Sequence, residues 1–115
     1  IDLQEMHHAI LTKNFTKLGE LTEFSCLKMH AVALSANPGL VYWNSTTIEC
    51  MQEIREMRKE GIETYFTIDA GPQVKVICQK KDVIFVKSRL SGVKGIKRIL
   101  ISASGPNASI LEDKN

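Results

Sequence analysis

One acidic residue lies in a sequence position where its carboxylate could take part in catalysis. Asp69 follows an apolar run that ends at Ile68, and Ala70-Gly71-Pro72 separates it from a second apolar run. A carboxylate on a stiff turn can act as a general base if it lies within hydrogen-bond reach of a substrate hydroxyl. Asp is equally at home in plain turns. The residues alone leave both interpretations open and favour the turn former.

The residues after Asp69 would let a ligand come close. Ala70 and Gly71 carry little side-chain bulk, so a small molecule could approach the backbone there. Pro72 fixes its own φ angle and stiffens the turn. The candidate site is therefore Asp69 as the catalytic residue and Ala70 and Gly71 as substrate-binding positions, with no metal ligand among them.

The histidines give weaker signals. His7 and His8 are adjacent on an expected helix, where neighbouring side chains point about 100° apart and cannot chelate one ion together. We interpret them as surface residues. His30 falls inside a long, largely apolar helix and has no Cys, His or carboxylate at ligand spacing. A hydrogen-bonded core histidine is the simpler interpretation.

Composition limits the class of protein. The chain has 115 residues, 43% of them hydrophobic and 24% charged, which is typical of one globular domain and excludes a disordered chain. The net charge of +2 is too small to indicate a nucleic-acid surface. No apolar run approaches the roughly 20 residues that a membrane span needs. We therefore expect neither nucleic acid nor membrane as a partner.

Three cysteines stand apart along the sequence, without a C-x-x-C pair, at Cys26, Cys50 and Cys78. This odd number argues against a disulfide framework or a zinc site and favours a reducing compartment, hence the cytoplasm. Their apolar surroundings predict small core residues. The first residue is Ile1 rather than Met, so we expect the chain to be a piece of a longer protein.

Two helices are expected to precede the candidate site, at 2–12 and 15–36. The second should end at Asn37-Pro38-Gly39 and be buried on more than one face. Helical spacing places five of its apolar residues along one side: Phe15, Leu18, Leu21, Met29 and Val32.

From residue 40 the pattern changes to strand, helix, strand, strand, helix, strand. Thr46 and Glu49 form the pattern of a capping box, and Asp82 stands where it could cap the second helix. A row of Ile48, Met51, Ile54 and Met57 predicts the buried side of the first helix. The expected strands are 40–43, 64–69, 74–79 and 96–103, and the expected helices are 46–60 and 82–92.

This βαββαβ order predicts a ferredoxin-like α+β domain. Its sheet should have four antiparallel strands with the two helices on one face, because each amphipathic helix must cover the apolar side of the sheet. The two leading helices, from residue 2 to 36, are an addition to that unit. The tail from Ser104 is turn-rich and then polar.

Two stretches resemble a known family. YFTIDAGPQVKVIC (65–78) and KNFTKLGELTEFSCLKMHAVALSANPGLVYWN (13–44) are similar to the C-terminal half of the mevalonate diphosphate decarboxylases, especially the bacterial type. These enzymes belong to the GHMP small-molecule kinase superfamily. Sibling kinases usually carry a glycine-rich motif where Asp69-Ala70-Gly71-Pro72 stands, so the acidic residue is the specific part. The resemblance fades after about Gly92.

The resemblance implies a reaction and its partners. An ATP- and Mg²⁺-dependent enzyme would phosphorylate the C3 hydroxyl of (R)-mevalonate 5-diphosphate, and phosphate and CO₂ would then leave to give isopentenyl diphosphate. Asp69 matches the family's catalytic aspartate. The chain would be the C-terminal domain of a two-domain, cytoplasmic, homodimeric enzyme.

The nucleotide is expected to bind elsewhere. Neither a Gly-x-Gly-x-x-Gly nor a Gly-x-x-x-x-Gly-Lys-Ser loop occurs in the chain. ATP and Mg²⁺ would then be bound mainly by the N-terminal half, and the 115-residue chain alone should be inactive. Two alternatives stay open: the domain of another GHMP kinase, which would release ADP without CO₂, or a regulatory module that binds a metabolite without chemistry.

Overall fold

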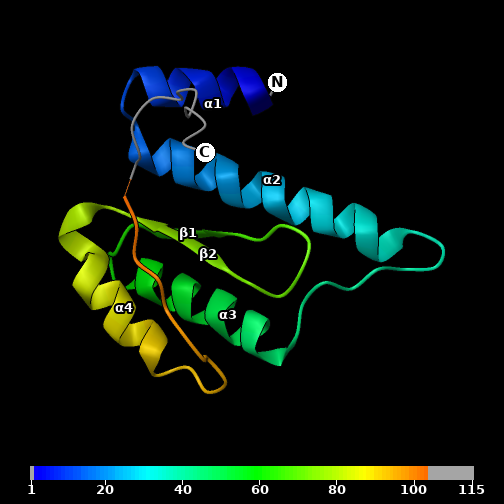
Figure 1. Cartoon of the computed structure of the whole chain (residues 1–115). Coiled ribbons are helices and arrows are strands. Elements are labelled where there is room, and N and C mark those ends of the chain that lie inside the picture. The colour runs from blue at the N-terminus through cyan, green and yellow to red at the C-terminus, as the bar shows by residue number, and fades with distance from the viewer. Residues whose placement is uncertain (1, 104–115) are drawn as a thin grey trace, which may run out of the picture.

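The chain folds into an α+β domain, as predicted. The computed structural model describes residues 2–103, so the tail from Ser104 lies outside the described residues. Figure 1 shows two leading helices above a β-hairpin and two more below it. No helix in the described residues is long and apolar enough to cross a membrane. The elements are α1 (Asp2–Leu11), α2 (Phe15–Ser35), α3 (Ser45–Lys59), β1 (Thr64–Thr67), β2 (Lys75–Cys78), the 3₁₀ turn η1 (Lys80–Asp82) and α4 (Val83–Ser91).

The hairpin is the whole sheet of residues 2–103. β1 and β2 pair antiparallel, with Thr64 opposite Cys78 and Thr67 opposite Lys75. Both strands lie inside their predicted ranges. The turn between the two strands contains the candidate site. The register of the hairpin therefore determines which residue of β2 lies near Asp69.

The described residues contain two of the four predicted strands. Residues 40–43 and 96–103 have no strand structure, although Trp43, Ile96 and Ile99 pack against the core. The apolar patterns of these two segments correctly predicted that some of their side chains pack against the core. A strand also needs a neighbour that pairs its backbone N–H and C=O groups, and the pattern does not name that neighbour.

The core lies between one face of the hairpin and the two helices α3 and α4. Side chains from all three contribute, so both helices cover the same face, as predicted. Met51 and Met57, predicted as helix core, are buried. The cluster comprises Cys26, Cys50, Met51, Ile54, Met57, Phe66, Ile68, Val86 and Leu90.

One member of the predicted core row of α3 lies outside the core. Ile48 is 45% exposed, whereas Met57 is 0% exposed. At about 100° per residue, positions three apart drift around the helix, so Ile48 and Met57 end on opposite sides. Thr47 and Cys50 complete the buried side in its place.

The helix starts also differ from prediction. Asn44 is the N-cap of α3: its Oδ1 accepts from the backbone N–H of Thr47 at 2.9 Å, and Thr47 Oγ1 accepts from the Asn44 N–H at 3.3 Å. The capping box predicted at Thr46 and Glu49 is therefore wrong, because Asn is at least as good an N-cap as Thr. Asp82 precedes α4 but makes no side-chain capping bond.

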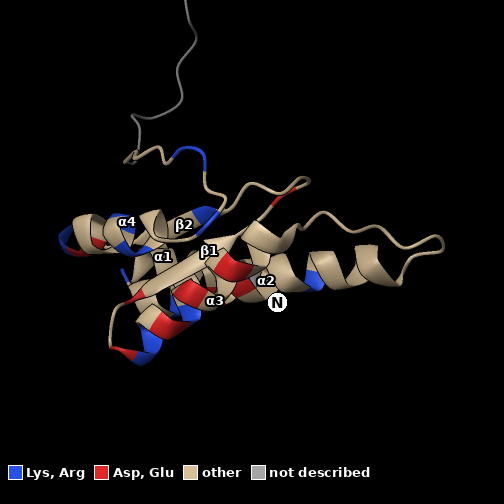
Figure 2. Ribbon diagram, turned by 90° about the horizontal axis from the view of Figure 1, so that it is seen from below, with Lys and Arg blue, Asp and Glu red and all other residues tan. Residues whose placement is uncertain are grey.

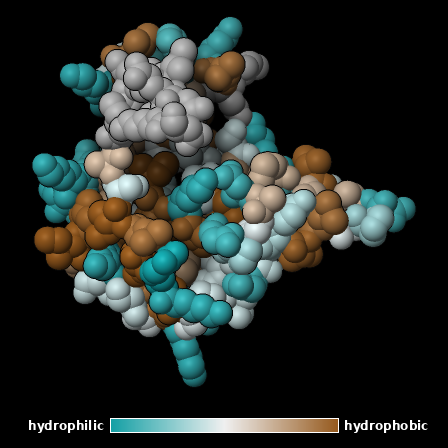
Figure 3. All heavy atoms as spheres, in the orientation of Figure 1, coloured by the Kyte–Doolittle hydropathy of each residue, from teal (hydrophilic) through white to brown (hydrophobic). Residues whose placement is uncertain are grey.

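Only part of the predicted apolar side of α2 is buried, and Leu21 is the buried member at 7% exposure. Met29 and Val32 are 46% and 71% exposed. Figure 3 shows apolar side chains on the surface over the C-terminal half of α2 and over α4. The buried residues of α2 are Gly19, Leu21, Glu23, Cys26 and His30, and three of them are polar or sulfur-bearing.

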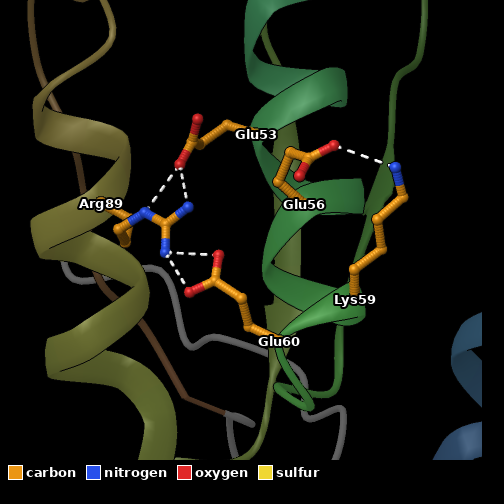
Figure 4. Close-up of polar contacts among 5 residues, drawn as sticks. All are labelled: Glu53, Glu56, Lys59, Glu60 and Arg89. Carbon is orange, nitrogen blue, oxygen red and sulfur yellow. Dashed lines mark hydrogen bonds and ion pairs between the residues drawn. The ribbon is translucent and has the colours of Figure 1, made fainter.

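Charged residues line the outside of α3, as Figure 2 shows. Arg89 of α4 forms ion pairs with two of these residues. One of its nitrogens lies 2.6 Å from Glu53 Oε1 and another 2.8 Å from Glu60 Oε2, both on or next to α3 (Figure 4). These contacts link α4 to α3 at the surface.

Candidate functional site

The predicted site residues lie together in the turn between β1 and β2. Asp69 and Ala70 are exposed, and Gly71 is half-buried. The φ angle of Gly71 is +116°, which L side chains rarely adopt, so glycine is suited to this position. The Asp69 carboxylate is therefore exposed to water, and the backbone conformation of the turn favours glycine at position 71.

Polar side chains of α2 cover the free edge of β1. Glu23 Oε1 accepts from the N–H of Phe66 at 3.3 Å, and Cys26 Sγ accepts from the N–H of Ile68 at 3.1 Å. His30 Nε2 lies 2.7 Å from the carbonyl oxygen of Ile68. Since β2 occupies the other edge of β1, these side chains supply the bonds that a further strand would otherwise make.

Arg58 of α3 completes this edge. Its Nη1 donates to the carbonyl oxygen of Thr64 at 2.9 Å, and its two terminal nitrogens lie 2.8 and 2.7 Å from the Glu23 carboxylate. The guanidinium also lies over the ring of Tyr65, 4.9 Å from its centroid. A side chain at Gly19 would collide with that ring, so glycine allows α2 to approach β1.

The far side of the turn is anchored by α3. The hydroxyl of Thr47 donates to the carbonyl oxygen of Pro72 at 2.8 Å, and Thr47 is only 1% exposed. Thr47 Oγ1 also lies 2.9 Å from Asn44 Oδ1, so its single hydrogen is shared between that oxygen and the Pro72 carbonyl. The turn from Ile68 to Pro72 is thus tied to α2 at one end and to α3 at the other.

Lys75 is the charged neighbour of Asp69. The register brings them together across the hairpin, and Lys75 Nζ lies 2.6 Å from Asp69 Oδ2. This hydrogen bond and the positive charge of Lys75 hold the pKa of Asp69 below its ordinary value, with a smaller contribution from His30. Asp69 is therefore ionised at neutral pH, although both side chains are about two-thirds exposed.

This arrangement suits a proton-accepting or orienting carboxylate. Asp69 is ionised and accessible on a fixed backbone, and Lys75 places a cation beside it that could contact an anionic group of a ligand. Within residues 2–103, no three His, Cys, Asp or Glu side chains gather as metal ligands do. His7 and His8 are exposed on α1, far along the chain from this turn.

Sequence reasoning did not connect three residues with the turn: Lys75, His30 and Thr47. The prediction that His30 is a hydrogen-bonded core residue is confirmed, since it is 1% exposed and bonded to Ile68. Its partner could not be predicted, because the two residues are 38 positions apart. Lys75 could have been found by continuing the hairpin pattern across the turn, since residues that face each other alternate with period two.

Comparison with known proteins gives consistent matches. Residues 2–98 match the family model of the mevalonate 5-diphosphate decarboxylase C-terminal domain. Diphosphomevalonate decarboxylase from Candida albicans is 27% identical over 120 residues, 90% of this chain and 33% of that protein. Phosphomevalonate decarboxylase from Haloferax volcanii is 26% identical over 112 residues, 96% of this chain and 34% of that protein. The chain spans about a third of the length of these relatives.

Solved structures agree with this match. A structure of the mevalonate diphosphate decarboxylase from Enterococcus faecalis is 41% identical, with a TM-score of 0.77, over 84% of this chain and 30% of its own. A structure described as MDDEF in complex with MVAPP, AMPPCP and magnesium has a TM-score of 0.77 and 42% identity over 82% of this chain and 29% of its own. The neighbours thus include a complex with an ATP analogue and magnesium.

Proposed function

The chain belongs to the mevalonate 5-diphosphate decarboxylase family, and we propose that it is the C-terminal domain of an ATP-dependent carboxy-lyase of that kind. The whole enzyme would convert (R)-mevalonate 5-diphosphate and ATP to isopentenyl diphosphate, ADP, phosphate and CO₂. The observation that carries this proposal is the turn itself. An ionised, accessible Asp69 stands on a backbone that two helices hold in place.

Asp69 is proposed to orient the C3 hydroxyl of the substrate and to accept its proton. A tertiary alcohol has a very high pKa and is a poor nucleophile, so a positioned carboxylate helps it attack the terminal phosphoryl group of ATP. Loss of the new phosphate as a leaving group then accompanies loss of CO₂. Ala70 and Gly71 would let the substrate approach the backbone beside Asp69.

ATP and Mg²⁺ are proposed to bind mainly to residues outside this chain. The residues present do not fit such a site by themselves: the sequence holds no phosphate loop, and the described residues hold no metal-ligand cluster. Calorimetry on the 115-residue chain should therefore detect no tight ATP binding. Micromolar binding would contradict this part of the proposal.

The decisive experiment is a product assay on the whole enzyme. ADP and CO₂ are measured together, with mevalonate 5-diphosphate and, separately, mevalonate 5-phosphate as substrates. Equal amounts of ADP and CO₂ from the diphosphate are expected. ADP without CO₂ would indicate a sister kinase instead. A preference for the monophosphate would indicate the reaction named for the Haloferax volcanii relative.

In the whole enzyme, we further propose, 40–43 and 96–103 pair as strands and complete a ferredoxin-like sheet of four. Side chains of α2 occupy the edge of β1, so the edge of β2 is the one available for addition. Partial burial of Trp43 and Ile96 against the core supports this position. Amide hydrogen exchange should then show protection in both segments, and rapid exchange there would contradict it.

The assembly and location are proposed from the same resemblance. The whole enzyme should be a homodimer, which light scattering of the full-length protein would test. A cytoplasmic location agrees with three free cysteines, since cytosolic proteins keep their thiols reduced. Cell fractionation would check it.

A further inference from the structure

His30 makes a contact that the proposed reaction does not by itself require. It is 1% exposed in the middle of α2, and its Nε2 lies 2.7 Å from the carbonyl oxygen of Ile68. A carbonyl oxygen can only accept, so Nε2 carries the hydrogen and donates it. The imidazole packs against two aromatic rings, with centroid distances of 5.8 Å to Tyr42 and 5.1 Å to Trp43. These contacts and the hydrogen bond together hold the imidazole beside Ile68.

The bonded carbonyl belongs to the residue directly before Asp69. It is part of the planar peptide unit that joins Ile68 to Asp69, so fixing it also fixes the nitrogen and Cα of Asp69. Cys26, one helical turn before His30, binds the N–H of the same Ile68. Both polar groups of Ile68 are thus held by α2, at the end of β1 where the hairpin register no longer holds the chain.

Thr47 fixes the other end of the same short segment through the carbonyl of Pro72. Between the two anchors, Asp69 and Ala70 are exposed and Gly71 is half-buried. The segment therefore combines a fixed backbone with an accessible carboxylate. Misplacing a reacting group by about 1 Å can cost on the order of 100-fold in rate, so such anchors matter most at a residue that does chemistry.

We propose that His30, with Thr47 at the opposite end, is a positioning residue that fixes the Ile68–Asp69 peptide and so aims the Asp69 carboxylate at the substrate hydroxyl. This inference rests on the proposed function. His30 and Thr47 touch neither substrate nor reacting atoms; they act through the backbone of the turn. A purely structural role would instead change stability and leave the turnover of folded enzyme unaltered.

Matched variants of the whole enzyme separate the two roles. His30→Gln keeps an N–H donor near the position of Nε2, whereas His30→Leu keeps a similar volume without a donor. Thr47→Ser keeps the hydroxyl that Thr47→Val removes. For each variant, kcat and KM for mevalonate 5-diphosphate are measured well below the lowest melting temperature of the set.

His30→Leu should lower kcat about 10- to 100-fold with KM changed less than about threefold, since it misplaces the base and not the diphosphate end. His30→Gln should recover most of that loss. Thr47→Val should lower kcat by roughly 10-fold and Thr47→Ser by much less. Equal kcat for His30→Leu and wild type, both folded, would overturn the inference.

A double-mutant cycle with Asp69→Asn tests whether His30 acts through Asp69. If it does, adding His30→Leu to Asp69→Asn should lower kcat hardly further. An undiminished second loss would overturn the inference. Should His30→Leu not fold, the Thr47→Val and Thr47→Ser pair, with Thr47→Val in the same cycle with Asp69→Asn, tests the proposed anchoring of the turn. A wild-type enzyme without decarboxylase activity would remove the proposed function and this inference with it, whereas an active enzyme indifferent to both anchors removes the inference alone.

Discussion

Arg58 and Arg89 both hold carboxylates at hydrogen-bond distance, but only Arg58 also reaches the backbone of the sheet. Arg58 binds Glu23 with side-chain exposures of 24% and 12%, and it donates to the carbonyl oxygen of Thr64. Arg89 binds Glu53 and Glu60 across two helices, with 30% of its own side chain and 50% of that of Glu60 exposed. Ion pairs of similar geometry therefore have two different roles: that of Arg58 supports the backbone of the sheet, and that of Arg89 links two helices.

The side of the molecule around α2 and β1 uses polar side chains to satisfy backbone groups. Glu23, Cys26 and His30 each bond to the free edge of β1 or its continuation, and that edge leads to Asp69. On the side formed by α3 and α4, charged groups bond mainly to each other. We infer that the first side sets the geometry of the site and that the second contributes a modest link between helices.

The largest expected effect is a loss of turnover when Asp69, which follows β1, is replaced. In the whole enzyme, Asp69→Asn should lower kcat at least about 100-fold, since a positioned general base contributes ~10²–10⁴-fold. The melting temperature should stay close to wild type, because Asn also suits turns. Steady-state kinetics and thermal melting of the same preparations measure both quantities.

Asp69→Ala serves as the control for a turn former. If Asp69 only shapes the turn, Asn should keep near-normal turnover while Ala loses stability. An Asn variant that retains most of its turnover would contradict the catalytic assignment and remove the functional difference between the two sides of the molecule.

The next effect is on stability at the same edge. Glu23→Leu should lower the free energy of unfolding by about 2–3 kcal/mol, because it leaves the N–H of Phe66 and the charge of Arg58 without their partner. Urea unfolding of the 115-residue chain measures this. Glu23→Gln, which can still accept from Phe66, should cost clearly less, and equal losses for both variants would show that the backbone bond is unimportant.

A smaller loss of stability is expected on the other side. Arg89→Met should lower the melting temperature by no more than about 3 °C, since its carboxylate partners remain hydrated and exposed ion pairs contribute little. Adding about 0.5 M salt should reduce the difference in melting temperature between Arg89→Met and wild type, because salt screens surface charges. A drop as large as that of Glu23→Leu would contradict the distinction between the two arginines.

The smallest effect is expected from Lys75→Met. Lys75 holds the pKa of Asp69 below its ordinary value, so its removal should raise that pKa and shift the acid limb of the titration to higher pH. At pH 7 Asp69 stays ionised in both proteins, so turnover should change little on this account. Any stability from the ion pair is present above the unfolded pKa of Asp69 and is lost as pH falls through the folded one.

NMR titration of the Asp69 carboxyl in both proteins checks this directly. An unchanged or lowered pKa in Lys75→Met would show that Lys75 does not control the charge of Asp69. A large fall in turnover at pH 7 would instead assign Lys75 a direct contact with substrate.

The local elements and the candidate turn could be predicted from the residues alone. Helical spacing and the Asn37-Pro38-Gly39 stop predicted α2 to within a residue of its end, and two apolar runs around Asp69 predicted the hairpin. The acidic residue in Asp69-Ala70-Gly71-Pro72 also indicated the family. Such signals are available because periodicity, turn chemistry and motifs act between residues close in sequence.

Packing between the elements determines how much of each side of α2 is buried and which residues hold the turn in place. The apolar pattern placed Met29 and Val32 on a buried side, but the helix lies along a strand edge whose N–H and C=O groups need partners. Glu23 therefore faces inward, beside Cys26 and His30, whose burial was predicted. The contacts of Glu23 with Phe66 and of His30 with Ile68 join residues 43 and 38 positions apart. Backbone groups carry no sequence signature of their own, and therefore their long-range partners are fixed only when the elements pack.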